Sequence, residues 1–199
     1  MSGSRIHSDL HIERRSHIRK ITAGLFISLD GVVEAPEKWT RAYASPEIDQ
    51  EIGAQMGQAD TMLLGRVTYE TFAASFAGQK GGIADAMNNM PKVVVSKTLA
   101  KAEWQNSVLI KGTDELSKLK QQPGRNIGVS GSPTLVRALI REGLLDQLQL
   151  MIFPIVLGSG KRLFAEDGNQ VQLKLADSRA TKTGVLLVRY ESVIGGREK

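Results

Sequence analysis

The stretch from residue 61 to residue 72 reads TMLLGRVTYETF, and its pattern decides the fold of the chain. Its first four residues are mostly apolar, which favours a short buried strand. Gly65 ends this run, and the residues from Arg66 to Phe72 follow with helical spacing. The order of strand, glycine and helix places a turn of backbone at the carboxyl end of a strand and at a helix N-terminus.

A second hinge of the same kind follows further along the chain. Residues 126–130 read NIGVS and predict a strand, and Gly131, Ser132, Pro133 and Thr134 lead from it into an amphipathic helix. Ligands of open α/β sheets bind at the carboxyl ends of strands, where the free N–H groups of helix N-termini favour phosphate. Each hinge alone also fits an ordinary strand end, but the two together suggest a dinucleotide.

The rest of the chain alternates strands with helices. Strands are expected at residues 21–28, 92–96, 108–110, 146–153, 171–176 and 184–193. Helices are expected at residues 46–56 and 115–120, and residues 78–82 are expected to form a flexible loop. This alternation predicts an α/β domain with a largely parallel central sheet, whose last two strands form an antiparallel hairpin at the edge.

Composition excludes several classes of protein. The 199 residues contain no cysteine, which removes disulfides, thiolate nucleophiles and thiolate metal sites. The three histidines, His7, His11 and His17, all precede residue 19, so the body of the chain lacks the imidazole of a Ser-His-Asp triad or a zinc site, and no metal is expected. No run approaches the roughly 18 consecutive apolar residues of a membrane-spanning helix.

The positive charge is concentrated at the N-terminus. The net charge is +5, and residues 1–20 carry five basic against two acidic residues, which leaves the remaining body close to neutral. This distribution argues against an extended nucleic-acid-binding surface. We expect residues 1–18 to be a basic, flexible extension and residues 19–195 to form one domain, and the polar start of the chain leads us to expect a cytoplasmic protein.

Short motifs around the two hinges are more specific than the hinges themselves. They are LGRVTYE at residues 64–70, VSKT at 95–98, SGS at 130–132, SLDG at 28–31, Pro154 with LGSG at 157–160, and LF at 163–164. With these motifs the chain resembles dihydrofolate reductases and, more closely, the reductase domain of the bifunctional riboflavin-biosynthesis deaminase-reductase, over residues 19–193. The resemblance implies a dihydrofolate-reductase-like three-layer fold with helices flanking the central sheet.

The resemblance also implies NADPH as the cofactor and assigns residues to it. Arg66 and Thr68, next to Gly65, would contact phosphates, and Ser96 and Lys97 would bind the 2′-phosphate that distinguishes NADPH from NADH. The pyrophosphate and ribose would be lined by the second hinge, at Ser130, Gly131, Ser132, Pro133, Thr134 and Leu135. Gly158 would shape the nicotinamide or substrate side, although a simple turn explains this glycine nearly as well.

Two carboxylates are alternatives for the catalytic acid. In dihydrofolate reductases a carboxylate on the helix before the Gly-Arg motif serves the substrate, and the position sixteen residues before Gly65 is Asp49. A solvated acidic helix face explains Asp49 equally well. Asp30 is the rival, since it follows the first strand, although an Asp-Gly turn also accounts for it.

Three functions remain open on this evidence. The first is an NADPH-dependent reductase of a pyrimidine- or pterin-like heterocycle, as in riboflavin biosynthesis; the others are a dihydrofolate reductase and a non-catalytic NADPH-binding protein. The zinc deaminase half of the bifunctional enzyme is excluded, because its cysteine ligands are absent. Apart from Lys161 and Arg162, basic residues to hold a phosphoribosyl group are missing. A homodimer is expected, with the apolar residues 148–157 partly exposed at a sheet edge.

Overall fold

The computed structural model describes residues 18–164 and 170–193. The predicted basic extension, up to residue 17, therefore lies outside the described residues. The strands are β1 (Ile21–Ser28), β2 (Ala59–Gly65), β3 (Lys92–Val95), β4 (Ser107–Ile110), β5 (Asn126–Ser130), β6 (Gln147–Phe153), β7 (Leu173–Ala180) and β8 (Leu186–Ser192). The helices are α1 (Pro46–Gln58), α2 (Arg66–Phe76), α3 (Gly82–Asn89), α4 (Asp114–Lys120) and α5 (Pro133–Arg141), with short 3₁₀ turns η1 (Pro36–Lys38) and η2 (Arg41–Tyr43).

The described strands form one eight-stranded sheet in the order β4-β3-β2-β5-β1-β6-β8-β7. The strands from β4 to β6 run parallel to one another, whereas β8 is antiparallel to both β6 and β7. This arrangement confirms the predicted fold class, a mostly parallel sheet with an antiparallel hairpin at one edge. The described helices are all too short to cross a lipid bilayer as an apolar span.

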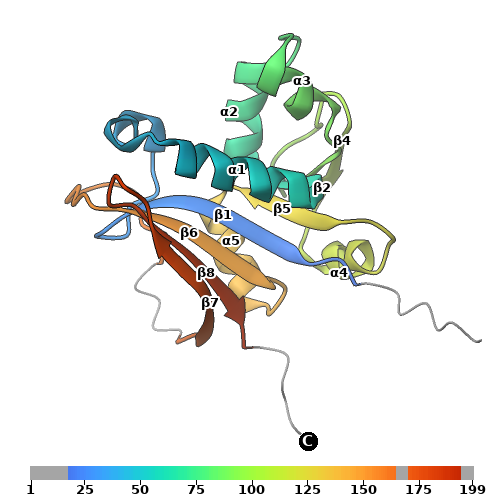
Figure 1. The fold of residues 1–199 in the computed structure, drawn as a ribbon. Coiled ribbons are helices and arrows are strands. Elements are labelled where there is room, and N and C mark those ends of the chain that lie inside the picture. Colours follow the sequence, from blue (N-terminus) through green and yellow to red (C-terminus); the bar gives the residue numbers. More distant parts are fainter. Residues whose placement is uncertain (1–17, 165–169, 194–199) are drawn as a thin grey trace, which may run out of the picture.

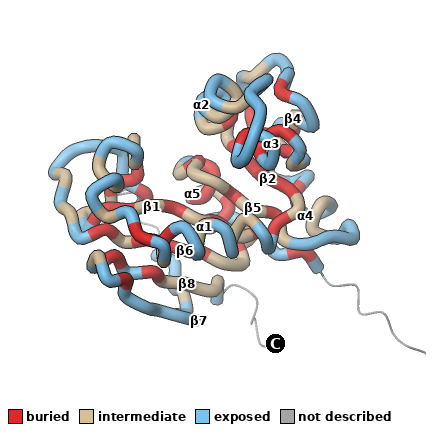
Figure 2. Tube along the Cα trace, turned by 45° about the horizontal axis from the view of Figure 1, so that its top comes forward, coloured by how far each residue is buried: buried red, intermediate tan, exposed pale blue. Residues whose placement is uncertain are grey.

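Helices cover both faces of the sheet and give three layers (Figure 1). Leu135 and Leu139 of α5 and Leu116 of α4 pack against Ala23, Leu25 and other residues of one face in the main core. On the opposite face, Ile48 of α1 packs against β6, while α2 and α3 pack on β2 and β3 in two smaller clusters. The central strands of the sheet, β1, β2, β5 and β6, are accordingly the most deeply buried part of the molecule (Figure 2).

Next to the apolar cluster of Phe26, Met151 and Phe153, the sheet face under α1 carries small and polar residues. Side chains alternate between the faces of a strand, so Thr22 and Gly24 of β1 point away from the main core that holds Ala23 and Leu25. In register with them lie Gly128 and Ser130 of β5, and Gln149 of β6 lies beside Gly24. These residues cannot fill the space beneath a helix, and a cleft results.

Two features of the fold differ from the predictions made from sequence: helix α3 and the exposure of residues 148–157. Helix α3 begins at Gly82, at the end of the predicted loop, and was not expected from its double glycine. The expected exposure of residues 148–157 is wrong for the strand itself, because β6 lies between β1 and β8. Leu148, Leu150 and Phe153 are therefore buried, and the edge strand on this side of the sheet is β7.

Candidate functional site

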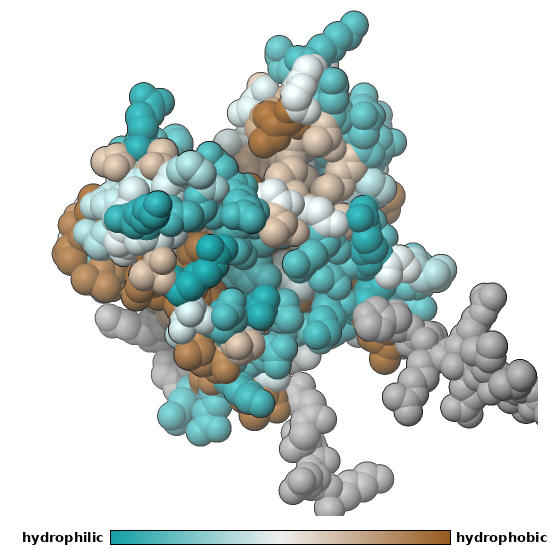
Figure 3. All heavy atoms as spheres, in the orientation of Figure 1, coloured by the Kyte–Doolittle hydropathy of each residue, from teal (hydrophilic) through white to brown (hydrophobic). Residues whose placement is uncertain are grey.

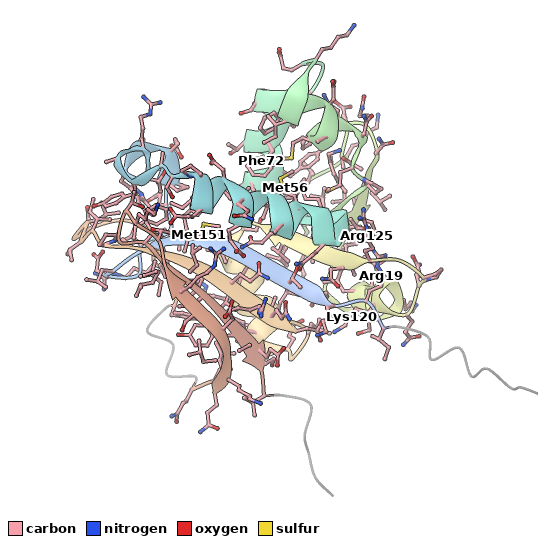
Figure 4. All side chains as sticks on the ribbon, in the orientation of Figure 1. Arg19, Met56, Phe72, Lys120, Arg125 and Met151 are labelled. Atoms are coloured by element: carbon pink, nitrogen blue, oxygen red, sulfur yellow. The ribbon has the colours of Figure 1, made fainter. Side chains whose placement is uncertain are left out.

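A large cleft runs across the α1 face of the sheet, at the carboxyl ends of the parallel strands. Its volume is about 1440 Å³, more than the roughly 300–1,000 Å³ that a drug-sized molecule occupies. The molecular surface is notched between the part with α1 and the part with α2 and α3 (Figure 3). Met56 of α1, Phe72 of α2 and Met151 of β6 all line the cleft (Figure 4). The volume suits a dinucleotide together with a second, smaller molecule.

The two predicted hinges meet in the middle of this cleft. The backbone N–H of Gly65, at the start of α2, donates to Ser132 Oγ at 2.9 Å. In return, the backbone N–H of Ser132, at the start of α5, donates to Thr68 Oγ1 at 3.0 Å. These reciprocal bonds hold two helix N-termini side by side, so that their dipoles and N–H groups converge on one region.

The second hinge has a strained backbone that keeps this region open. Gly131 and Ser132 both have positive φ, at 56° and 52°, and a Cβ at Gly131 would lie 3.3 Å from Thr68 Cγ2. Neither α2 nor α5 has a side-chain N-cap, which leaves the first N–H groups of each helix without the usual partner. Both features fit a site that receives an anion on main-chain donors.

The structure brings almost all of the predicted cofactor residues into this one cleft. Those that line it are Gly65, Arg66, Thr68, Ser96, Lys97, Ser130, Gly131, Ser132, Pro133, Thr134 and Leu135. The exception is Gly158, which is exposed, has a φ of 76° and donates its N–H to Asp30 Oδ2 at 2.9 Å. Gly158 thus forms a turn outside the cleft, which agrees with the simple turn that was the alternative explanation for this glycine.

Basic side chains mark the far end of the cleft, next to β3 and β4. Lys97 is exposed there, while Ser96 is buried and its Oγ accepts the backbone N–H of Leu99 at 2.9 Å. The Ser96 hydroxyl therefore shapes the turn that presents Lys97. Lys111 also lines this end, and sequence reasoning missed it because no motif surrounds it.

The structure does not place Asp30 in the cleft, contrary to its expected catalytic position. Its carboxylate accepts hydrogen bonds from Ser28 Oγ at 2.7 Å and from the backbone N–H groups of Leu157 and Gly158 at 3.1 and 2.9 Å. The bond from Ser28, followed by the one from Leu157, lowers the pKa of Asp30 to about 2. A carboxylate that stays ionised and holds a loop is poorly suited to donate a proton at neutral pH.

Asp49 is likewise absent from the residues that line the cleft. It is exposed in the first turn of α1, where Ser45 caps the helix and Pro46 begins it. The side chains of α1 that do reach the cleft belong to Ile52, Gln55 and Met56. The helix therefore presents an amide to the cleft where the sequence suggested a carboxylate.

The part of the cleft under α1 is a bay lined by apolar and neutral polar residues. The residues that line it from β1, α1 and β6 are Thr22, Gly24, Leu25, Phe26, Ile52, Gln55, Met56, Gln149 and Met151. We call this part the inner bay. Charged groups lie beside it: Gln55 and Gln149 also line a small neighbouring pocket with Glu51, Asp177, Arg179 and Arg189, and Arg189 of β8 is in register with Gln149. The surface of the inner bay is apolar with a few neutral polar groups.

The three-layer architecture and the order of its strands define a dihydrofolate-reductase-like fold. Solved structures with this fold include a protein assigned to riboflavin biosynthesis in Shewanella sp. PV-4, with a TM-score of 0.70 and 20% identity, covering 87% of this chain and 98% of that one. Dihydrofolate reductase from Enterococcus faecalis, solved with NADP(H), has a TM-score of 0.60 and 14% identity, covering 87% of this chain and 96% of its own.

The family model of the RibD C-terminal domain matches residues 19–187, and the chain belongs to this family. Two relatives are the uncharacterized proteins YyaP and YwjB of Bacillus subtilis strain 168. YyaP is 27% identical over 179 residues, which is 86% of this chain and 94% of YyaP. YwjB is 26% identical over 168 residues, which is 81% of this chain and 91% of YwjB.

Proposed function

We propose that this protein is an NADPH-dependent reductase of a pyrimidine- or pterin-like heterocycle. The observation that carries the proposal is the pair of hydrogen bonds between Gly65, Thr68 and Ser132, which joins two uncapped helix N-termini inside one cleft. A pyrophosphate has two phosphate groups and can accept hydrogen bonds from two helix N-termini at once. The family and the shared fold support a reductase over the other dinucleotide-binding proteins.

The residues of the cleft fit this cofactor at each of its charged parts. Thr134 and the backbone beside Gly131 would hold the pyrophosphate with Arg66, whose guanidinium lies on the exposed side of α2 and pairs with Glu70 at 2.9 Å. Lys97 and Lys111 would neutralise the 2′-phosphate at the far end. The nicotinamide ring, which supplies the hydride when the cofactor is bound, would extend toward the inner bay.

The protein's own part in the reaction is to orient the substrate and to exclude water around it. The inner bay provides apolar walls for a flat ring and neutral amides for its polar edge. Because Asp30 and Asp49 lie outside the bay, we propose solvent water at the mouth as the proton source. The position of Asp30 and Asp49 outside the cleft is also the observation that favours the alternative function, a protein that binds NADPH without turnover.

The test is NADPH oxidation in the presence of pterin and pyrimidine acceptors, with dihydrofolate as one of them. Oxidation with a pyrimidine or pterin is expected for the wild type. Arg66→Ala and Lys97→Ala should each raise the KM for NADPH by about tenfold, since each removes a charge-assisted phosphate contact. Lys101→Ala is the matched control, because Lys101 is exposed outside the cleft and pairs with Glu103.

Each outcome of this assay separates the functions. Oxidation with dihydrofolate alone would make the protein a dihydrofolate reductase. Saturable NADPH binding without oxidation by any acceptor would support the non-catalytic alternative. An equal loss in Lys101→Ala would contradict the assignment of the cofactor phosphates.

A further inference from the structure

Glu34 is a carboxylate held in a fixed position at the mouth of the cleft. It lines the cleft together with Lys161, and its Oε2 accepts the backbone N–H of Lys161 at 3.0 Å. The backbones of the two segments are also paired, since the N–H of Val33 donates to the carbonyl of Lys161 at 2.9 Å. These contacts join the loop after β1 to the loop after β6, and they fix where the Glu34 side chain lies in the cleft wall.

The backbone that follows Glu34 is strained and firmly held. Ala35 has a φ of 44°, in the left-handed region that disfavours a side chain, and it also lines the cleft. The carbonyl of Glu34 accepts the indole N–H of Trp39 at 2.9 Å. Trp39 in turn packs in one cluster with Phe26 and Met151, two residues that line the inner bay. Glu34 is therefore fixed at the end of the cleft where the inner bay lies, by a segment whose strain is typical of functional sites.

The neighbouring cations are placed for the phosphates and not for Glu34. Lys161 Nζ donates to Thr134 Oγ1 at 2.9 Å, so this ammonium lies at the start of α5, beside the place proposed for the pyrophosphate. Arg162 lies 3.7 Å from Asp30. None of the ion pairs between described residues includes Glu34. Its negative charge thus stands one step beyond the pyrophosphate, toward the inner bay.

Glu34 differs from the other carboxylates that line the described part of the cleft. Asp114 and Glu142 belong to the far end, where Glu142 accepts a hydrogen bond from Thr113 Oγ1. Glu37 shares the mouth with Glu34, but no hydrogen bond or ion pair with another described residue fixes its side chain. Among the described residues, Glu34 is therefore the oriented negative charge at the end proposed for the nicotinamide.

We propose that the ionised carboxylate of Glu34 lies against the nicotinamide ring and favours the oxidised, positively charged form of the cofactor. This inference rests on the proposed function and adds a catalytic residue to the same site. The ring carries a positive charge in NADP⁺ and none in NADPH, so a fixed negative charge beside it stabilises NADP⁺ selectively. The same carboxylate aids the reaction, because it stabilises the charge that develops as the ring is oxidised and the heterocycle is reduced by the transferred hydride.

The experiment compares the dissociation constants of NADP⁺ and NADPH for the full chain and for Glu34→Gln, by equilibrium titration. The amide oxygen of the glutamine can still accept the N–H of Lys161, so this variant removes the charge and keeps the contact. We expect Glu34→Gln to bind NADP⁺ about fivefold more weakly than the wild type, with its affinity for NADPH nearly unchanged. The shift in the ratio of the two constants should shrink at high salt, where charges are screened.

Glu47→Gln is the matched control. Glu47 also accepts a backbone N–H from a distant loop, that of Lys182 at 3.3 Å, but it does not line the cleft. The ratio of the dissociation constants for this variant should equal that of the wild type. Thermal melting checks that both variants are folded.

The outcomes keep this inference distinct from the proposed function. Failure of both nucleotides to bind to the wild type would overturn the proposed function itself. If both bind and Glu34→Gln weakens them equally, as expected for a residue that only holds the loop, or changes neither, the contact of Glu34 with the nicotinamide is overturned. An equal shift of the ratio in Glu47→Gln would overturn it too. A salt-dependent shift confined to Glu34→Gln would support it.

Discussion

Asp30 shows how one carboxylate can tie a distant loop to the first strand. Its oxygens hold the backbone of Leu157 and Gly158, more than a hundred residues later in the chain. Asp30→Asn should loosen this loop and lower the melting temperature, because an amide offers one acceptor where the carboxylate offers two. Differential scanning calorimetry measures this, with Asp49→Asn as the control for an exposed carboxylate.

The same residue predicts a dependence of stability on pH. The pKa of Asp30 is about 2 in the folded protein and 3.8 ordinarily, so its contribution is complete above pH 3.8 and is lost as the pH falls through 2. The difference in melting temperature between the wild type and Asp30→Asn should therefore shrink between these two pH values. A difference that stays constant with pH would contradict the bonding of an ionised Asp30.

A substitution at Gly131 is expected to weaken the binding of NADPH. Gly131→Ala places a Cβ at a positive φ and 3.3 Å from Thr68 Cγ2, so it should lower both stability, by about 1 kcal/mol, and NADPH affinity, by about tenfold. Gly78→Ala is matched, because Gly78 also has positive φ, at 75°, but stands outside the cleft with open space around it. This control should lose stability but retain its affinity for NADPH. For both variants the affinity is measured by NADPH titration with tryptophan fluorescence.

At the residue scale, local motifs could be predicted from the sequence, but the directions in which helix side chains point could not. Residues such as Gly131 and Ser132 follow from sequence because their function lies in a backbone conformation that neighbouring residues determine. The side of α1 that faces the cleft depends on which residues pack against β6, and Ile48 does so. The count of sixteen residues back from Gly65 therefore pointed to Asp49 as the residue facing the cleft, whereas the packing of α1 turns Gln55 toward it.

At the scale of elements, one buried lysine joins α3 to strand β3 of the sheet. Lys92 of β3 is almost fully buried, and its ammonium donates to the carbonyls of Asn88, Met90 and Gln105 at 2.8–3.2 Å. It also lies 4.1 Å from the ring centroid of Trp104. Lys92→Met should reduce the free energy of unfolding by about 2 kcal/mol in urea denaturation, because these carbonyls lose a donor. Lys101→Met, at an exposed position, should change it little.

Burial lowers the pKa of Lys92 to about 8 from 10.5. Between these values the unfolded chain holds the proton and the folded chain releases it, so this residue makes the protein more stable as the pH rises. The stability difference between wild type and Lys92→Met should accordingly grow from pH 8 to pH 10.5. A difference that falls over this range would contradict the lowered pKa.

The elements themselves followed from sequence where their signals were local. The parallel strands and the two hinges were predicted because short apolar runs end at Gly65 and Gly131. Helix α3 was missed because its start holds Gly81 and Gly82, and its buried face includes the polar Asn88. That asparagine is buried because its Oδ1 accepts the Trp104 Nε1–H at 2.7 Å, a contact that sequence patterns do not reveal.

At the scale of the whole molecule, the hairpin of β7 and β8 leaves an exposed edge. Nearly all residues of β7 are exposed, and Leu175 and Leu186 on this hairpin are 51% and 45% exposed. Apolar side chains lie among hydrophilic ones over this part of the molecule (Figure 3). We propose that the expected homodimer forms through this edge, because an unpaired edge strand with apolar side chains favours pairing.

The dimer is tested by sedimentation equilibrium. The wild type should sediment with twice the 21.7 kDa mass of the chain, and Leu175→Lys should sediment as a monomer. Val108→Lys is the control, since Val108 is 61% exposed on β4 at the opposite edge of the sheet. A wild-type monomer, or a dimer broken only by Val108→Lys, would contradict pairing through β7.

The central claim is that the joined helix starts of α2 and α5 hold the phosphates of NADPH. A titration of the wild type with NADPH and with NADH, followed by quenching of tryptophan fluorescence, tests it most directly. The structure predicts saturable binding of NADPH at least about tenfold tighter than that of NADH, since Lys97 and Lys111 would meet the 2′-phosphate. Failure of both nucleotides to bind would contradict the account.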